Sequence, residues 1–125
     1  MALWIAYSAD WRAARQKTAA FRYALAAAGR SMRSTLANAP DLEQPGLIKR
    51  QLLVGLDIAS ERIAYALGLG VTDVDLLQQA LSAQSVLRIC RTEVEQSLEE
   101  EFGKPGFNGL AAMIEDAVTK AWGPP

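Results

Sequence analysis

Residues 46–70, GLIKRQLLVGLDIASERIAYALGLG, form the most apolar continuous segment of the 125-residue chain. Apolar and small side chains recur in it at spacings of three and four residues, which places them on one stripe of an α-helix. This stripe, the expected core face, consists of Ile48, Leu52, Leu56, Ala59, Ile63 and Leu67. Gly55 and Ala59 lie near it, where small side chains let a second helix approach closely. We expect this stretch to be the central helix of the fold.

A second apolar series runs along the roughly opposite side of the same predicted helix. It steps by seven and four residues and consists of Leu47, Val54, Ile58, Tyr65 and Leu69. A helix that is apolar around most of its circumference is either central in its domain or pressed against a partner chain. Because so short a chain leaves little protein to surround it, we expect this series to be an oligomer interface, most simply that of a homodimer. The alternative is a half-exposed stripe on a monomeric bundle.

The first forty residues predict a long helix with a continuous apolar seam. Ser8 or Asp10 can cap this helix, and it stops before Pro40 because proline disfavours the helical conformation of the residue before it. Because glycine weakens a helix, a kink or break at Gly29 is an alternative to one continuous helix. The seam alternates steps of three and four, as in shallow-angle bundle packing. It consists of Trp11, Ala14, Thr18, Phe21, Leu25, Ala28, Met32 and Leu36.

Four helices are expected in all, and no segment alternates apolar and polar residues as a strand would. Thr72 with Asp75 forms a weak capping box before the third helix, and Asn108 can cap the last. Connections of under ten residues indicate antiparallel neighbours. The sequence therefore predicts one all-α domain over residues 1–125, an up-and-down four-helix bundle with long helices. The predicted helices span about 9–38, 46–69, 73–102 and 109–122.

Cysteine content and hydropathy indicate the cellular compartment in which we expect the protein. Cys90 is the only cysteine, so an intrachain disulfide is impossible, which fits a reducing compartment. Its place on a core stripe favours a buried thiol over a reactive one. No run approaches the ~18 apolar residues of a membrane span, and the N-terminus lacks the basic region of a signal peptide. We therefore expect a soluble cytoplasmic protein that does not contact a membrane.

The chain contains no histidine, which removes the commonest general base and the commonest metal ligand. The Ser-His and Cys-His pairs of nucleophilic catalysis are removed with it. Asp57 and Glu61, one turn apart on the central helix, and the run Glu99-Glu100-Glu101 are interpreted as solvated carboxylates. We expect no catalytic residue, no metal and no cofactor, and hence a protein that is not an enzyme.

Five arginines of the first predicted helix fall within about one quadrant of its surface, beside the apolar seam. Residues 1–40 carry a net charge of +5 and residues 71–103 a net charge of −5, within a total of −1. The arginines therefore either pair with acidic residues of the third helix, within the chain or across an interface, which the slightly acidic total favours, or contact phosphates of a nucleic acid. They are Arg12, Arg15, Arg22, Arg30 and Arg33.

Residues 60–79, SERIAYALGLGVTDVDLLQQ, resemble the helix-turn-helix pattern of bacterial DNA-binding proteins. Ala64 stands where that family has a small residue, Gly68 stands at its turn glycine, and Val74 and Leu77 stand at buried apolar positions. The resemblance implies a second helix that reads DNA, but this helix has no Arg or Lys to meet bases or phosphates. We therefore interpret the segment as a helix that ends in glycine, followed by a capped helix.

These observations predict a non-enzymatic helical protein–protein interaction module, such as an adaptor, accessory or assembly factor, that self-associates. A nucleic-acid-binding regulator that uses the five arginines is the first alternative. The second alternative is a small-ligand-binding bundle or a histidine-independent enzyme, which would need a pocket between helices lined by convergent polar groups.

Overall fold

The computed structural model describes the backbone of residues 2–42, 44–103 and 106–124, and their side chains except at 2–7, 99, 101 and 106. Within this part of the chain there is no strand, and no helix has the length and apolar character needed to cross a membrane. The four helices are α1 (Ala2–Asn38), α2 (Pro45–Leu67), α3 (Val74–Gln96) and α4 (Gly106–Trp122), with 3-10 turns at Ala39–Asp41 and Glu99–Phe102.

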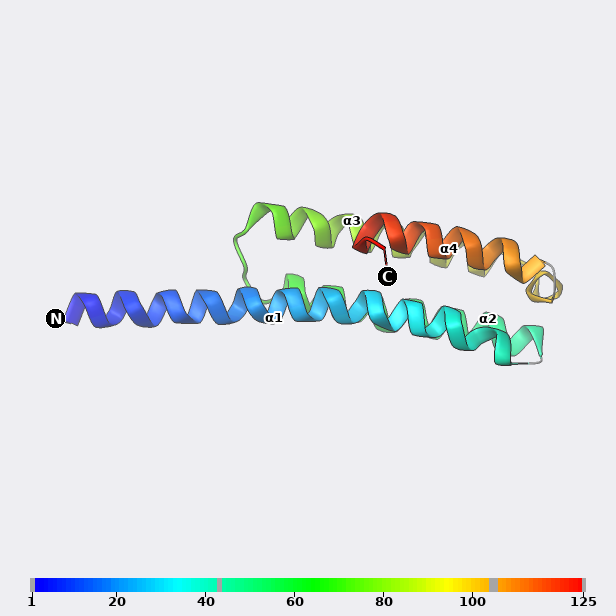
Figure 1. The fold of residues 1–125 in the computed structure, drawn as a ribbon, viewed down its shortest axis with the longest axis horizontal. Coiled ribbons are helices and arrows are strands. Elements are labelled where there is room, and N and C mark those ends of the chain that lie inside the picture. The colour runs from blue at the N-terminus through cyan, green and yellow to red at the C-terminus, as the bar shows by residue number, and fades with distance from the viewer. Residues whose placement is uncertain (1, 43, 104–105, 125) are drawn as a thin grey trace.

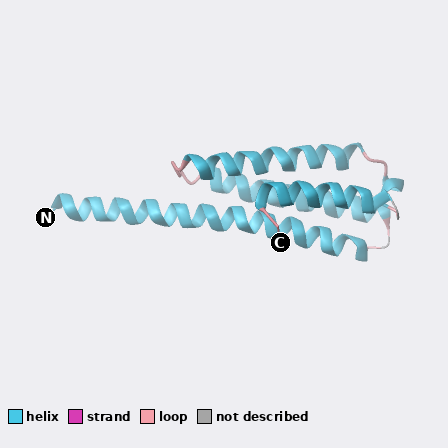
Figure 2. Ribbon diagram, turned by 45° about the horizontal axis from the view of Figure 1, so that its top comes forward, coloured by secondary structure: helices cyan, strands magenta, loops and turns pink. Residues whose placement is uncertain are grey.

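The helices form an up-and-down bundle in which each packs on the next and α4 closes on α1 (Figure 1). The predicted all-α four-helix bundle is therefore confirmed. The helices differ in length, and the N-terminal part of α1 extends beyond the other three (Figure 2). Every side chain from Ala9 to Lys17 is exposed. The bundle thus holds only the C-terminal half of its longest helix.

The core lies against the predicted face of α2, which we name the inner stripe. Its side chains from Ile48 to Ile63 are buried, and Leu67 is partly buried against the core. Gly55 allows the close approach to α1, because a Cβ built there would lie 2.6 Å from both Cγ2 and Oγ1 of Thr35. Thr35 is buried and its hydroxyl donates to the Ser31 carbonyl at 2.9 Å, so its polar atom is satisfied.

The seam of α1 divides at the edge of the bundle. Its C-terminal part, from Phe21 to Met32, is buried in the core, whereas Trp11 is 56% exposed and Ala14 is exposed as well. The reason is that the N-terminal part of α1 extends beyond all three other helices (Figure 2). Sequence periodicity had indicated one buried face along the whole helix, and this expectation is wrong for the first half.

Gly29 does not break α1, which is continuous from Ala2 to Asn38. The glycine instead makes room for the indole of Trp122, whose Cγ and Cδ1 would lie 2.8 Å from an added Cβ. The indole Nε1–H donates to the Leu25 carbonyl at 2.7 Å. A small residue in the middle of α1 therefore receives the last side chain of α4.

The predicted helix starts differ from the observed ones. Ser8 and Asp10 lie inside α1, and Asn108 lies inside α4, so none of them is a cap. The cap of α3 is Asp73 and not Thr72, because the Asp73 carboxylate accepts from the Leu76 N–H at 3.2 Å.

The end of α3 also differs, since the helix stops at Gln96 and not near Phe102. Lys49 of α2 donates from Nζ to the carbonyls of Ser97, at 2.7 Å, and Glu95, at 3.3 Å. A lysine near a helix C-terminus satisfies carbonyls that have no partner within the helix. The helix therefore ends where a neighbouring helix supplies this cation.

We predict that Gly55→Ala destabilises the protein by about 1–3 kcal/mol, because the new methyl group overlaps a stiff, buried threonine. Gly109→Ala is the matched control, since no atom lies within 4 Å of a Cβ there. It should stabilise α4 by up to about 1 kcal/mol through helix propensity. Urea unfolding followed by circular dichroism measures both changes. Equal stability of the two variants would contradict the close approach.

Candidate protein interaction surface

The side of α2 that faces away from the core carries four large apolar side chains, which we name the outer stripe. Leu47 is 41% exposed, Val54 45%, Ile58 39% and Tyr65 63%. The fifth predicted member, Leu69, lies beyond the end of α2 and is partly buried against the core. The outer stripe is therefore a row of exposed apolar groups along nearly the whole helix.

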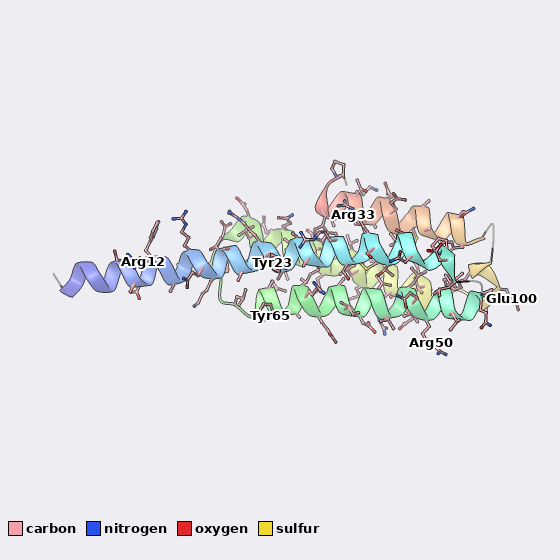
Figure 3. The ribbon with its side chains drawn as sticks, turned by 60° about the horizontal axis from the view of Figure 1, so that its bottom comes forward. Arg12, Tyr23, Arg33, Arg50, Tyr65 and Glu100 are labelled. Atoms are coloured by element: carbon pink, nitrogen blue, oxygen red, sulfur yellow. The ribbon has the colours of Figure 1, made fainter. Side chains whose placement is uncertain are left out.

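A shallow groove of about 450 Å³ adjoins the Tyr65 end of the outer stripe, between α1 and α2. Its α1 wall includes Tyr23, which is largely exposed, with Ala24 and Ala27 as small residues beside it. Figure 3 shows Tyr23 and Tyr65 on these two neighbouring helices. At the Tyr65 end, the apolar surface is therefore wider, because it continues from α2 across the groove onto α1.

Charged side chains flank the outer stripe. Asp57 accepts from Arg91 of α3, with Nε and Oδ1 2.7 Å apart, and Arg91 also pairs with Glu95. The hydrogen bond and charge of Asp57, together with the charge of Glu95, raise the pKa of Arg91. Arg50 and Glu61 are exposed, and neither belongs to an ion pair among the described side chains. Two opposite charges beside the stripe are thus available to a partner.

The five arginines of α1 do not form one uniform surface. Arg12, Arg15, Arg22 and Arg30 are exposed, whereas Arg33 is partly buried and donates to the Gly123 carbonyl. Figure 3 shows Arg12 on the projecting part of α1 and Arg33 within the bundle. The guanidinium of Arg15 lies 5.3 Å from the ring centre of Trp11, and that of Arg30 lies 5.7 Å from that of Tyr23.

Pairing of these arginines with acidic residues of α3 within the chain is not observed among the described side chains. The ion pairs found there join Arg91 to Asp57 and Glu95, and Lys120 to Asp116. Two of the exposed arginines, Arg15 and Arg30, instead lie over aromatic rings of their own helix.

Few polar side chains are buried inside the bundle in the part of the chain that the structure describes. Thr35 is the one buried residue there with a polar side chain other than cysteine, and no group of three potential metal ligands occurs among these residues. Cys90 is 2% exposed, and its burial, followed by the charge of Glu93, raises the pKa of its thiol. The arrangement provides no cluster of titratable groups around this thiol.

The helix-turn-helix resemblance is not carried into the three-dimensional arrangement. Val74 is 64% exposed, although the pattern would place it at a buried position. The segment instead joins two helices that pack side by side in the bundle.

Comparisons of the chain with protein families, curated proteins and solved structures find no match.

We predict that Cys90 reacts slowly with a thiol reagent such as Ellman's reagent at pH 7–8. A raised pKa lowers the fraction of reactive thiolate at this pH, and burial restricts access. The rate should rise by at least about 10-fold in denaturant, since modification then no longer needs an opening of the fold. Equal rates in native and denaturing buffer would contradict a buried thiol.

Proposed function

We propose that the protein is a non-enzymatic helical interaction module, such as an adaptor, accessory or assembly factor, that self-associates through the outer stripe of α2. The observation that carries this proposal is the row of four exposed apolar side chains along one helix. Contiguous apolar patches on a protein surface are typical of interaction sites. The exposed apolar side chains of α3 support it less, since Val74, Leu81 and Ile89 form a sparser series at steps of seven and eight residues.

We expect two copies of the chain to associate through the outer stripe with moderate affinity. Each side chain of the outer stripe is already about half buried in the monomer, so its complete burial gains on the order of 1 kcal/mol. Eight such side chains in a dimer must offset the loss of translational and rotational freedom. The dimer should therefore be reversible, and its population should depend on protein concentration.

The alternative of a small-ligand-binding bundle or a histidine-independent enzyme has less support. It needs convergent polar groups in a pocket between helices. The described side chains of the core are apolar apart from Thr35, and the groove between α1 and α2 is an open surface feature beside the outer stripe. A cytoplasmic setting is part of the proposal, and the buried, unpaired thiol of Cys90 fits a reducing compartment.

The test of self-association is the double variant Val54→Glu/Ile58→Glu. If the outer stripe is the interface, burying two carboxylates per copy should abolish the dimer and leave a folded monomer. Light scattering over a concentration series gives the mass, and circular dichroism gives the fold. A variant that unfolds, or one that keeps the mass of the unmodified protein, would contradict the proposal.

The matched control is Leu81→Glu/Ile89→Glu, which places the same two charges at exposed apolar positions of α3. The mass of this variant should equal that of the unmodified protein at every concentration. Loss of the dimer in the control and not in the outer-stripe variant would assign the interface to α3.

A nucleic-acid-binding regulator is the second candidate, and one observation favours it. Four of the five arginines of α1 are exposed, and none of them is held in an ion pair among the described side chains. Two of them lie over exposed aromatic rings. Arginine beside aromatic side chains is a common combination in single-strand binding, where bases stack and phosphates are neutralised.

We predict that, if this second function operates, each of Arg12→Gln, Arg15→Gln and Arg22→Gln lowers the salt dependence of DNA binding. The slope of log K against log salt should fall by about 0.7 for each lost phosphate contact on a single strand. Fluorescence anisotropy of a labelled single strand measures the slope. Arg88→Gln, on α3, is the control and should leave it unchanged. Absence of binding at low salt would exclude this function.

A further inference from the structure

We propose that the partner on the outer stripe is a second copy of this chain packed antiparallel, in a register fixed by ion pairs between Arg50 of one copy and Glu61 of the other. This inference rests on the proposed self-association and adds the direction and alignment of the two helices. The spacing of the apolar side chains and the charges beside them carry it independently of each other.

The apolar spacing is self-complementary in one antiparallel register. Suppose that a two-fold axis passes at the level of residue 56. A residue a given number of positions before 56 then lies opposite the residue of the second copy that is the same number of positions after 56. Val54 then lies opposite Ile58 of the second copy, because residue 56 is midway between them. Leu47 lies opposite Tyr65 for the same reason. A single register therefore pairs all four members of the outer stripe, as an isologous interface requires.

The same register brings opposite charges together. Arg50 and Glu61 are eleven residues apart, which at 100° per residue places them within about 20° of each other on one flank of the stripe. Antiparallel packing brings this flank against the same flank of the second copy. The level of Arg50 then differs from that of the other Glu61 by one residue, or about 1.5 Å. Symmetry forms this pair twice.

Parallel packing would not form these ion pairs. Each residue would then lie at the level of its own equivalent, so Arg50 would be about 16 Å along the axis from Glu61 of the second copy. That separation is far beyond the reach of an ion pair. Arg50 would instead share a level with the other Arg50. The charge pattern therefore favours the antiparallel arrangement over the parallel one.

The remaining charges near the stripe are compatible with this register. Asp57 is on the same flank and nearest the axis, and Arg91 of its own chain already neutralises it. Arg62 shares its level with Arg50 of the second copy, but the two lie about 120° apart around the helix, on opposite flanks of the stripe. On its own flank Arg62 is one residue from the level of Gln51 of the second copy, which is neutral. Leu47 of the second copy reaches the level of Tyr65, at the rim of the groove between α1 and α2.

The first experiment is a charge exchange measured by the dissociation constant of the dimer. Arg50→Glu alone and Glu61→Arg alone should each raise this constant about 10-fold, because two ion pairs become two like-charge contacts. The double variant Arg50→Glu/Glu61→Arg should return it close to that of the unmodified protein. The effects should weaken at high salt. Both positions are exposed, so the fold should be unchanged in each variant.

Failure of this inference is distinguishable from failure of the proposed function. If Val54→Glu/Ile58→Glu abolishes the dimer but the charge exchanges have no effect, the interface stands and the register is wrong. If the double exchange does not recover the affinity that the single exchanges lost, the register is also wrong. A chain that is monomeric at every concentration, or whose dimer survives Val54→Glu/Ile58→Glu, overturns both.

A second experiment tests the direction of the helices by disulfide formation under mild oxidation with copper phenanthroline. Leu47→Cys and Tyr65→Cys proteins should cross-link when mixed and not when oxidised separately. In the proposed register the two copies of residue 47 are about 27 Å apart along the axis, whereas a disulfide needs Cα atoms within ~7 Å. Cross-linking of Leu47→Cys with itself would overturn the antiparallel arrangement.

Discussion

The close contact between α2 and α1 at Gly55 and Thr35 is the constraint on which the bundle depends. Because glycine lets the backbones approach, the inner stripe of α2 can reach the buried seam of α1 and form one apolar core. The position of α2 is then fixed, and so is the direction of its other face. The outer stripe is exposed as a consequence of this packing, since no other helix of the chain covers it in the described structure.

The sequence predicted the faces that the helices bury in the bundle and several helix ends, such as Asn38 and Trp122, whereas the starts of α1 and α4 and the end of α3 were predicted wrongly. Periodicity records which face a helix buries, so the inner stripe from Ile48 to Ile63 was predicted correctly. Helix ends depend on single polar groups. Asp73 caps α3 through a local contact with Leu76, whereas the lysine of α2 reaches the last carbonyls of α3 from another helix. Hydrophobic periodicity encodes neither contact.

The candidate surface was foreseeable in part. A second apolar series on α2 is visible in the sequence, but whether Leu69 belongs to it depends on where the helix ends. Glu61 is interpreted from the sequence only as a solvated carboxylate, and its relation to Arg50 is not predicted, although their eleven-residue spacing is visible in the sequence. Among the described side chains, Arg50 and Glu61 matter as the unpaired charges of this flank because Asp57 is already paired with Arg91, thirty-four residues away in the chain. Sequence spacing alone could not separate the paired charge from the unpaired ones.

α1 is one unbroken helix whose two halves are stabilised differently. From Phe21 to Met32 it is held by buried side chains, whereas from Ala9 to Lys17 all of its side chains are exposed. An isolated helix of fewer than ~12–15 residues is marginal in water, so this exposed part is helical because it continues a helix that the bundle has already nucleated. The free energy of local opening therefore falls along α1, from that of global unfolding near Phe21 toward zero at Ala9. Amide hydrogens along a single helix thus exchange over the full range of protection that the protein offers.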